Sequence, residues 1–135
     1  MRMMVIGLDC VPPKFVFDWW RDELPAFNKL MAAGVYGTLT STIPPITVPA
    51  WACMMTSQDP GQLGIYGFRN RKDHSYGGLD IAHAKKVHVP YLWETLSEYG
   101  KTSIVIGVPL TYPVRPLKGV LISSFLAPSK KADFT

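Results

Sequence analysis

Cysteine is scarce in this sequence, and long apolar runs are missing from it. The two cysteines, Cys10 and Cys53, lack the C-x-x-C spacing of metal and redox motifs and the density of a disulfide-rich secreted domain. We expect free thiols, with a single disulfide between them as the alternative. No apolar run approaches the roughly 20 residues that span a bilayer, and the first one ends at Asp9, before it reaches the length of a signal peptide. The sequence therefore predicts a cytoplasmic protein with no membrane partner.

Dense charge of one sign is also missing. The chain has 14 lysines and arginines against 10 acidic residues, a formal net charge of +4, which slightly favours an anionic partner. The basic residues do not form a stripe with interleaved aromatic residues, so we expect no nucleic-acid polymer as a partner. The cluster of Arg69, Arg71 and Lys72 is interpreted as a solvated loop surface, with contact to an anionic substrate as the alternative.

Short apolar segments alternate with helical patterns along the chain. Apolar runs typical of strands buried on both faces occupy residues 3–8, 102–107 and 120–125. Helical patterns occupy residues 15–33, 47–57 and 89–100. Strands that alternate with helices predict an α/β fold with a parallel, doubly wound sheet and flanking helices. At 135 residues, the chain has the size of one domain.

The segments between these elements are less regular. Residues 35–42 are rich in β-forming residues, and residues 59–88 are polar and contain five glycines, which predicts a long loop. The last residues, 128–135, are interpreted as a frayed tail. In the helix predicted at residues 89–100, three apolar residues are spaced by about one helical turn and are predicted to form its buried face: Leu92, Leu96 and Tyr99.

Asp9 stands where an α/β sheet is expected to bind ligands. It follows the first predicted strand, and ligands of open α/β sheets bind beyond the carboxyl ends of the strands. A carboxylate at this place suits a divalent metal ion. The alternative is a local role, in which the side chain accepts hydrogen bonds from the backbone of the next turn.

Thr47 begins the predicted helix at 47–57 and is surrounded by Pro44, Pro45 and Pro49. Prolines before a helix or within its first turn do not interrupt it, and here they restrict how the threonine is presented. A helix N-terminus offers unpaired N–H groups and a partial positive charge, both of which suit a phosphate group. The alternative is an N-cap threonine that contributes about 1 kcal/mol to helix stability.

The segments around these two residues resemble a known family. The segments are VIGLDC, LPAFNKLMAAGVYGTLTSTIPPITVPAWACMMTSQDPGQLGIYGF and VPLTYPVRPLKGVLISSFLAPS, which together span nearly the whole chain. They resemble the start of the alkaline phosphatase superfamily, in its type I phosphodiesterase/nucleotide pyrophosphatase branch. The resemblance implies the N-terminal part of a three-layer α/β sandwich.

The resemblance also implies a two-metal phosphoryl-transfer site. Asp9 matches the family's metal-binding aspartate, and Thr47 matches the threonine that is both the nucleophile and a ligand of the same metal. The implied cofactors are two divalent metal ions, zinc or manganese. The implied substrate is a small-molecule phosphoester, which a phosphodiesterase or nucleotide pyrophosphatase hydrolyses.

The remaining metal ligands of this family lie further along a longer catalytic domain. His74, His83 and His88 lack the spacing of zinc ligands and are interpreted as solvated loop residues. We therefore expect residues 1–135 to be the truncated N-terminal portion of such a domain. This portion holds only part of the site, so we expect no turnover from it alone. The alternative is a non-catalytic α/β module that binds an anion, or that associates with itself or a complementary chain through an exposed sheet edge or apolar face.

Overall fold

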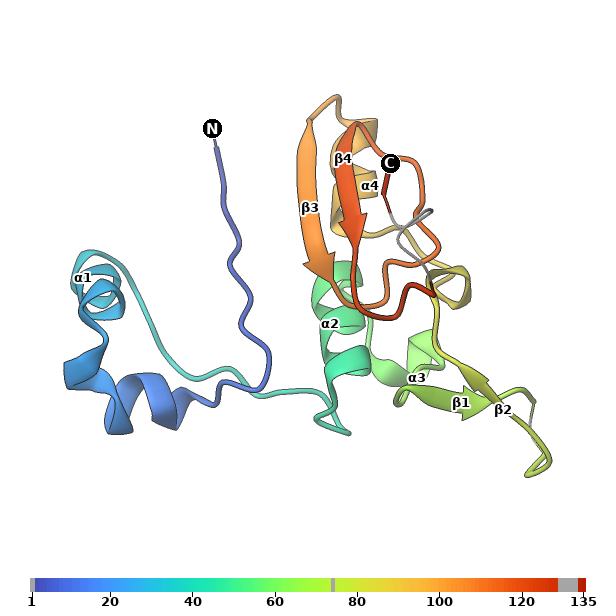
Figure 1. Cartoon of the computed structure of the whole chain (residues 1–135), viewed down its shortest axis with the longest axis horizontal. Coiled ribbons are helices and arrows are strands. Elements are labelled where there is room, and N and C mark those ends of the chain that lie inside the picture. The colour runs from blue at the N-terminus through green and yellow to red at the C-terminus, as the bar shows by residue number, and fades with distance from the viewer. Residues whose placement is uncertain (1, 74, 129–133) are drawn as a thin grey trace. The chain divides into compact units, whose positions relative to one another are not determined.

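The structure, a computed structural model, divides into two compact units, whose elements are labelled in Figure 1. It describes residues 2–73, 75–128 and 134–135. Unit one is Met1–Thr40 and unit two is Ser41–Thr135. Small sheets and helices together give a mixed α/β fold, which confirms the predicted class in general terms.

Some of the predictions concern residues that the structure does not describe. They are the solvated position of His74 and most of the frayed tail, namely residues 129–133. Within the described ranges, no helix is long and apolar enough to cross a membrane.

Unit one consists of short helical segments after an extended N-terminus. Its elements are a π-helix at Phe15–Trp19 (η1), a 3-10 helix at Arg21–Glu23 (η2) and α1 at Pro25–Ala33. Pro25 occupies the first turn of α1, where its fixed φ suits a helix and its missing N–H costs no intrahelical bond. These elements confirm the predicted helical character of residues 15–33.

The structure assigns no strand to the two segments of unit one that were predicted as β. Residues 3–8 and 35–42 are irregular or extended, and Val5 and Ile6 are 62% and 75% exposed. A strand needs a neighbour for its backbone N–H and C=O groups, and the described part of unit one contains no strand to provide one. Val16 is the one buried side chain among residues 2–40, so unit one has little core of its own.

Unit two contains the other helices and both sheets. Its helices are α2 (Thr47–Thr56), α3 (Pro60–Leu63), the 3-10 helix η3 (Ala84–Lys86) and α4 (Leu92–Glu98). Its strands are β1 (Arg69–Arg71), β2 (Leu79–Ile81), β3 (Ser103–Val108) and β4 (Gly119–Ser123). The helix predicted at 47–57 and the strands predicted at 102–107 and 120–125 are confirmed, apart from their ends.

Residues 59–88 contain more regular secondary structure than the loop predicted for them. They form α3, the antiparallel hairpin β1–β2 and η3. The Asp59 carboxylate accepts the Gln62 N–H at 2.8 Å, and the Gln62 side chain accepts the Asp59 N–H at 3.0 Å. Asn70 Oδ1 accepts the Tyr66 N–H at 2.8 Å. Polar side chains thus accept hydrogen bonds from backbone N–H groups here. For this reason the polar composition did not indicate the short helices and strands.

β3 and β4 form a parallel pair and lie side by side (Figure 1). The register pairs Ser103 with Gly119 and Ile106 with Ile122. Gly119 has a φ of 140°, and a Cβ at this position would collide with the backbone of Ser103, so only glycine fits. Among the described residues no third strand joins this pair, so the doubly wound layout of the predicted sheet is not confirmed. Phe134 forms an isolated antiparallel bridge with Ile122 of β4, so the prediction of a frayed tail is wrong for this end of the chain.

The core of unit two begins with one face of α2. Val48, Ala52 and Met55 follow each other at spacings of four and three residues and are all buried. They pack with apolar side chains from the rest of the unit: Leu63, Ile65, Ala82, Val87, Tyr91, Trp93, Val105, Leu110 and Leu121. This continuous core fixes the helix on which Thr47 lies.

α4 buries a different face from the predicted one. Leu92, Leu96 and Tyr99 are at least 36% exposed. Trp93, by contrast, is 4% exposed, and its ring stacks on the buried ring of Tyr91 with 4.7 Å between the centroids. Aromatic rings bury more area than leucines, so this pair sets the rotation of α4 about its axis.

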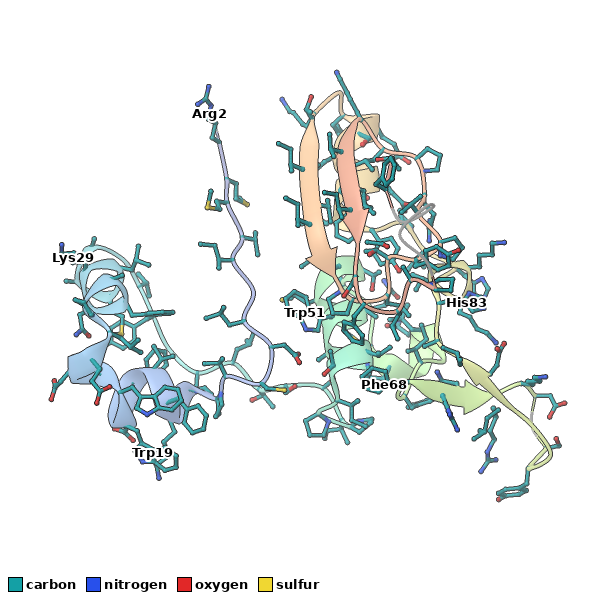
Figure 2. The ribbon with its side chains drawn as sticks, in the orientation of Figure 1. Arg2, Trp19, Lys29, Trp51, Phe68 and His83 are labelled. Atoms are coloured by element: carbon teal, nitrogen blue, oxygen red, sulfur yellow. The ribbon has the colours of Figure 1, made fainter. Side chains whose placement is uncertain are left out.

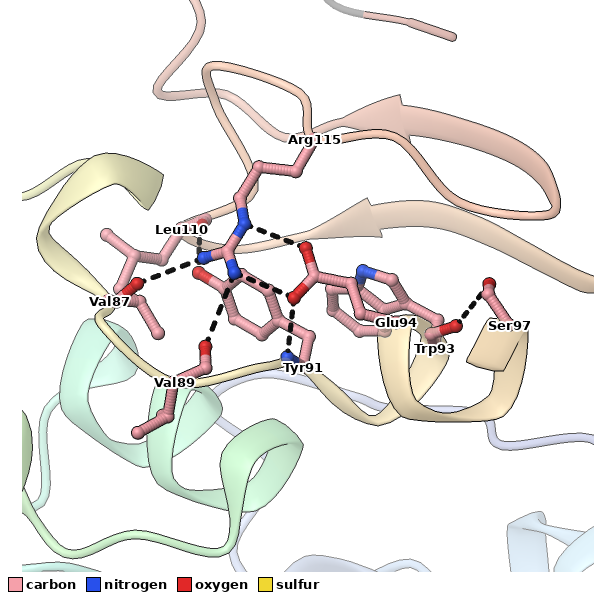
Figure 3. Close-up of polar contacts among 8 residues, drawn as sticks. All are labelled: Val87, Val89, Tyr91, Trp93, Glu94, Ser97, Leu110 and Arg115. Atoms are coloured by element: carbon pink, nitrogen blue, oxygen red, sulfur yellow. Dashed lines mark hydrogen bonds and ion pairs between the residues drawn. The ribbon is translucent and has the colours of Figure 1, made fainter. Parts of the chain in front are cut away.

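Arg115, in the connection between β3 and β4, binds Glu94 of α4 (Figure 3). Its Nε lies 2.7 Å from Glu94 Oε1, and its Nη2 lies 2.7 Å from Oε2, which is a bidentate ion pair. The guanidinium also donates to the carbonyl oxygens of Val87 at 3.0 Å and Val89 at 3.4 Å. Glu94 Oε2 accepts the Tyr91 N–H at 2.9 Å, which caps α4.

Tyr91 extends this network into the core. Its hydroxyl donates to the Leu110 carbonyl at 2.6 Å, and the Arg115 guanidinium lies 5.0 Å from the centre of its ring. Burial raises the pKa of Tyr91 far above its usual value, so the hydroxyl keeps the proton that it donates. Arg115 and Tyr91 together join α4 to both ends of the β3–β4 connection.

We expect Arg115→Ala to lower the free energy of unfolding of unit two by about 2–3 kcal/mol, because it leaves the poorly exposed Glu94 carboxylate and two carbonyl groups without their partner. Urea denaturation followed by tryptophan fluorescence measures the loss, since Trp93 lies beside the network. Arg71→Ala, at an exposed arginine of β1, is the matched control, with an expected change within about 0.5 kcal/mol. Equal losses in the two variants would contradict the importance of the network.

Candidate functional site

The segment before α2 is held by hydrogen bonds to one proline carbonyl. The Pro44 carbonyl accepts the Thr42 hydroxyl at 2.9 Å and the Ile46 N–H at 3.0 Å. Ile46 is the extended N-cap of α2, and its carbonyl accepts the Ala50 N–H at 3.0 Å. Thr47 is therefore the first helical residue and not the N-cap, and the N-cap residue Ile46 makes no side-chain cap hydrogen bond. The N-cap alternative for Thr47 is wrong.

Thr47 lies at the border between the core and the surface. It is half-buried, whereas the adjacent Val48 is fully buried. Pro49 has no N–H, so the first turn of α2 presents the N–H groups of Thr47 and Val48 at its start. Trp51, one turn later on the same face, is half-buried and is labelled in Figure 2. The Thr47 hydroxyl thus lies at the positive end of a helix, which suits an anionic group.

Asp9 lies in an exposed turn of unit one. The Cys10 thiol donates a hydrogen bond to Asp9 Oδ2 at 3.2 Å, and Cys10 has a φ of 56°. The pKa of Cys10 is raised because its thiol is hydrogen-bonded to the carboxylate and because the negative charge of Asp9 disfavours a thiolate. Cys10 therefore stays protonated near neutral pH and is a weak nucleophile and metal ligand. Sequence reasoning missed this contact, although the two residues are adjacent.

The two predicted site residues belong to different units, Asp9 to unit one and Thr47 to unit two. Their combination in a single site therefore stays a prediction. Across the residues that the structure describes, no group of three or more histidine, cysteine, aspartate or glutamate side chains could hold a metal ion. The oxygen donors of Asp9 and Thr47 match a divalent metal ion in kind, but a complete site needs additional ligands.

The two described histidines differ from each other. His88 is exposed, in agreement with its interpretation as a solvated loop residue. His83, labelled in Figure 2, is half-buried, and its Nδ1 is buried without a hydrogen-bond partner in the described part of the chain. Its neighbours Ala82 and Ala84 are buried, and this apolar setting was the signal in the sequence that could have indicated its burial.

The model of the type I phosphodiesterase/nucleotide pyrophosphatase family matches residues 3–132, which is most of the chain and includes Asp9 and Thr47. The chain belongs to this family. Membership confirms the resemblance seen in the sequence. A comparison with curated proteins and one with solved structures give no significant match.

Family membership gives the chain a function in general terms. It implies a hydrolase of the phosphodiesterase or pyrophosphatase type that acts on a small-molecule phosphoester, and members of the family generally depend on metal ions. The mixed α/β fold of the chain is compatible with this family. Family membership alone does not identify the nucleophile or the metal ligands.

The contact between Asp9 and Cys10 gives a prediction for the pH dependence of thiol alkylation. In buffer with a chelator, we expect the rate of Cys10 modification by iodoacetamide to rise with a midpoint above the ordinary pKa of a thiol, since only the thiolate reacts. Asp9→Asn removes the negative charge and should move the midpoint to lower pH. Mass spectrometry of the separate Cys10 and Cys53 peptides measures both rates. An unchanged Cys10 midpoint in Asp9→Asn would show that the carboxylate does not act on the thiol.

Proposed function

We propose that the chain provides part of the active site of a metal-dependent phosphodiesterase or nucleotide pyrophosphatase, with Thr47 as the nucleophile. The observation that supports this most is the position of Thr47 as the first residue of α2, directly after the N-cap. An attacking hydroxyl at this position brings the phosphoryl group to the helix N-terminus, where backbone N–H groups share its developing negative charge.

Several features of α2 suit a nucleophile that must not move. Val48 and Pro49 are both fully buried, so the backbone on the C-terminal side of Thr47 is held by the core. On the other side, the bond from the Ile46 N–H to the Pro44 carbonyl holds the approach to the helix. A hydroxyl held from both sides costs little entropy when a substrate arrives, which is the basis of catalysis by positioning.

Asp9 and Thr47 are proposed as ligands of one of two divalent metal ions, zinc or manganese. A bound metal would lower the pKa of the Thr47 hydroxyl, which is otherwise a poor nucleophile at neutral pH. Carboxylate and hydroxyl oxygens support this assignment by their chemistry. The other ligands are proposed to come from a longer catalytic domain of which residues 1–135 form the N-terminal portion.

We further propose the parallel, doubly wound sheet of the sequence prediction, with the apolar segment at residues 3–8 as one of its strands. Two observations support it. Residues 3–8 are apolar, extended and exposed. One face of the β3–β4 pair also exposes Ile104 and Ile106, which are 74% and 67% exposed. Parallel sheets are normally covered on both faces, and a strand at this place would bring Asp9 to the carboxyl edge of the sheet.

The nucleophile assignment predicts that any metal-dependent hydrolysis of bis(p-nitrophenyl) phosphate by the chain depends on Thr47. With Mn²⁺ or Zn²⁺ titrated into the assay, Thr47→Ala should reduce kcat by about 10³-fold or more, because removal of a nucleophile removes the reaction path. Thr47→Ser, which keeps a hydroxyl, should retain part of the rate. Thr56→Ala is the matched control, since the Thr56 hydroxyl lies on the same helix and is bonded to the Ala52 carbonyl at 2.7 Å.

Turnover that survives in Thr47→Ala would exclude Thr47 as the nucleophile. Robust turnover that is lost in Thr47→Ala would exclude the second candidate function, a non-catalytic α/β module. Turnover that is absent at every metal concentration agrees with a partial site. The exposed apolar face of the β3–β4 pair favours self-association for such a module, because a large apolar face on a monomer is an interaction surface. The residues of that face are Ile104, Ile106, Val120 and Ile122.

Self-association through this face predicts a molar mass that rises with protein concentration. Analytical ultracentrifugation from low micromolar to near-millimolar concentration measures it. Ile104→Lys/Ile106→Lys should shift the chain to the monomer, since two charges would be buried in the interface. Leu92→Lys/Tyr99→Lys, at exposed positions of α4, is the control and should leave the mass unchanged. A chain that stays monomeric at all concentrations would exclude self-association.

A further inference from the structure

An ordinary surface hairpin exposes its polar side chains and buries its apolar ones, whereas the hairpin β1–β2 exposes aliphatic side chains. The register places Arg69 opposite Ile81 and Arg71 opposite Leu79. All four side chains are exposed, with Leu79 and Ile81 at 59% and 58%. Because opposite residues share a face of a sheet, these four form one surface, which we call the hairpin face. Two aliphatic side chains therefore lie in solvent, each opposite an arginine on the neighbouring strand.

The opposite face of the hairpin has the polar residues. Asn70 is 9% exposed and bonded to the backbone of Tyr66 and Gly67. Asp80 lies half-buried and forms an ion pair with Lys86 at 2.9 Å. The inward residues are thus held by hydrogen bonds and ion pairs, and the aliphatic residues are turned outward. Exposed aliphatic residues gathered on one face indicate an interaction surface rather than a random surface composition.

The hairpin region is also where the positive charge of the chain is concentrated. Residues 66–88 contain five lysines and arginines and two aspartates, which is a net charge of +3 out of the +4 of the whole chain. Asp80 is already paired with Lys86. The described residues form no ion pair with Arg69 or Arg71. The guanidinium of Arg71 lies 4.0 Å from the centre of the Tyr76 ring, which is 90% exposed.

The hairpin face defines the chemistry of a complementary partner. Residues two apart on a strand point to the same side and are separated by roughly 7 Å, so Arg69 and Arg71 match two carboxylates at alternate positions of an extended segment. Leu79 and Ile81, on the neighbouring strand, match aliphatic side chains. Arginine and aromatic residues beside aliphatic ones are typical of protein–protein interfaces.

We propose that the hairpin face binds an acidic, aliphatic segment of a partner protein in an extended conformation. A lipid surface fits less well, because the turn of the hairpin, the part that would enter a membrane first, includes the acidic Asp73. Single-stranded nucleic acid fits less well too, because its bases stack on aromatic rings, and Leu79 and Ile81 offer none.

Fluorescence anisotropy with a labelled eight-residue peptide tests this interaction on the full chain. The peptide has glutamates and leucines at alternate positions and serines between them, so that its acidic and aliphatic side chains share one side when it is extended. Arg69→Glu/Arg71→Glu should weaken binding at least about tenfold, because like charges then face each other. Leu79→Ser/Ile81→Ser should weaken it severalfold and make the remaining binding more sensitive to salt. Lys29→Glu/Lys101→Glu changes the net charge equally at exposed positions outside the hairpin and should leave the affinity within about twofold.

Three outcomes would overturn the proposal. The first is an equal loss of peptide binding in the Lys29→Glu/Lys101→Glu control, which would indicate attraction by net charge alone. The second is tighter binding of a labelled 20-nucleotide oligo-dT than of the peptide, with the same dependence on Arg69 and Arg71. The third is tighter binding to phosphatidylserine vesicles than to the peptide. All the altered side chains are exposed, so we expect every variant to fold. Circular dichroism of each variant checks this.

Discussion

The bidentate ion pair between Arg115 and Glu94 is the interaction on which the arrangement of unit two depends. It holds the connection that leads into β4 against α4, while the Tyr91 hydroxyl holds the Leu110 carbonyl at the other end of that connection. With both ends held, a connection without a helix can place β4 parallel to β3. A charged pair with little exposure is stable here because nearly every hydrogen-bonding group in it has a partner. The core beneath α2 can then close around this frame.

The start of α2 and the hairpin face both belong to unit two, but they differ in which side chains are held in place and which are exposed. At the start of α2, buried neighbours and local hydrogen bonds restrict the backbone on both sides of Thr47, the residue proposed as the nucleophile. In the hairpin, polar residues such as Asn70 are held inside, and aliphatic residues such as Leu79 are exposed. The first arrangement suits a small anionic group, and the second suits an extended chain. Unit two therefore contains both the proposed nucleophile and, separately from it, the surface proposed for a protein partner.

Several elements of the fold could be predicted from the sequence, whereas the site formed by Asp9 and Thr47 stays a prediction. The helix at Thr47 and the two strands of the parallel pair were predicted because proline positions and apolar runs are local signals. The buried face of α4 was not, because it depends on Arg115 and on the stacking of Tyr91 on Trp93, which are contacts between distant segments. Residues 3–8 have the composition of a strand but lack a partner in unit one.

Gly119 has a consequence for the uniqueness of the strand register. Its position against the Ser103 backbone leaves no room for a side chain. A slip of β4 by one residue in either direction would bring Lys118 or Val120 to the same place, and both have side chains that would collide there. The two strands could otherwise slide, because their apolar residues are similar to each other. One missing side chain thus excludes the neighbouring registers, so specificity comes from the steric cost of the alternatives as well as from attraction in the native pairing.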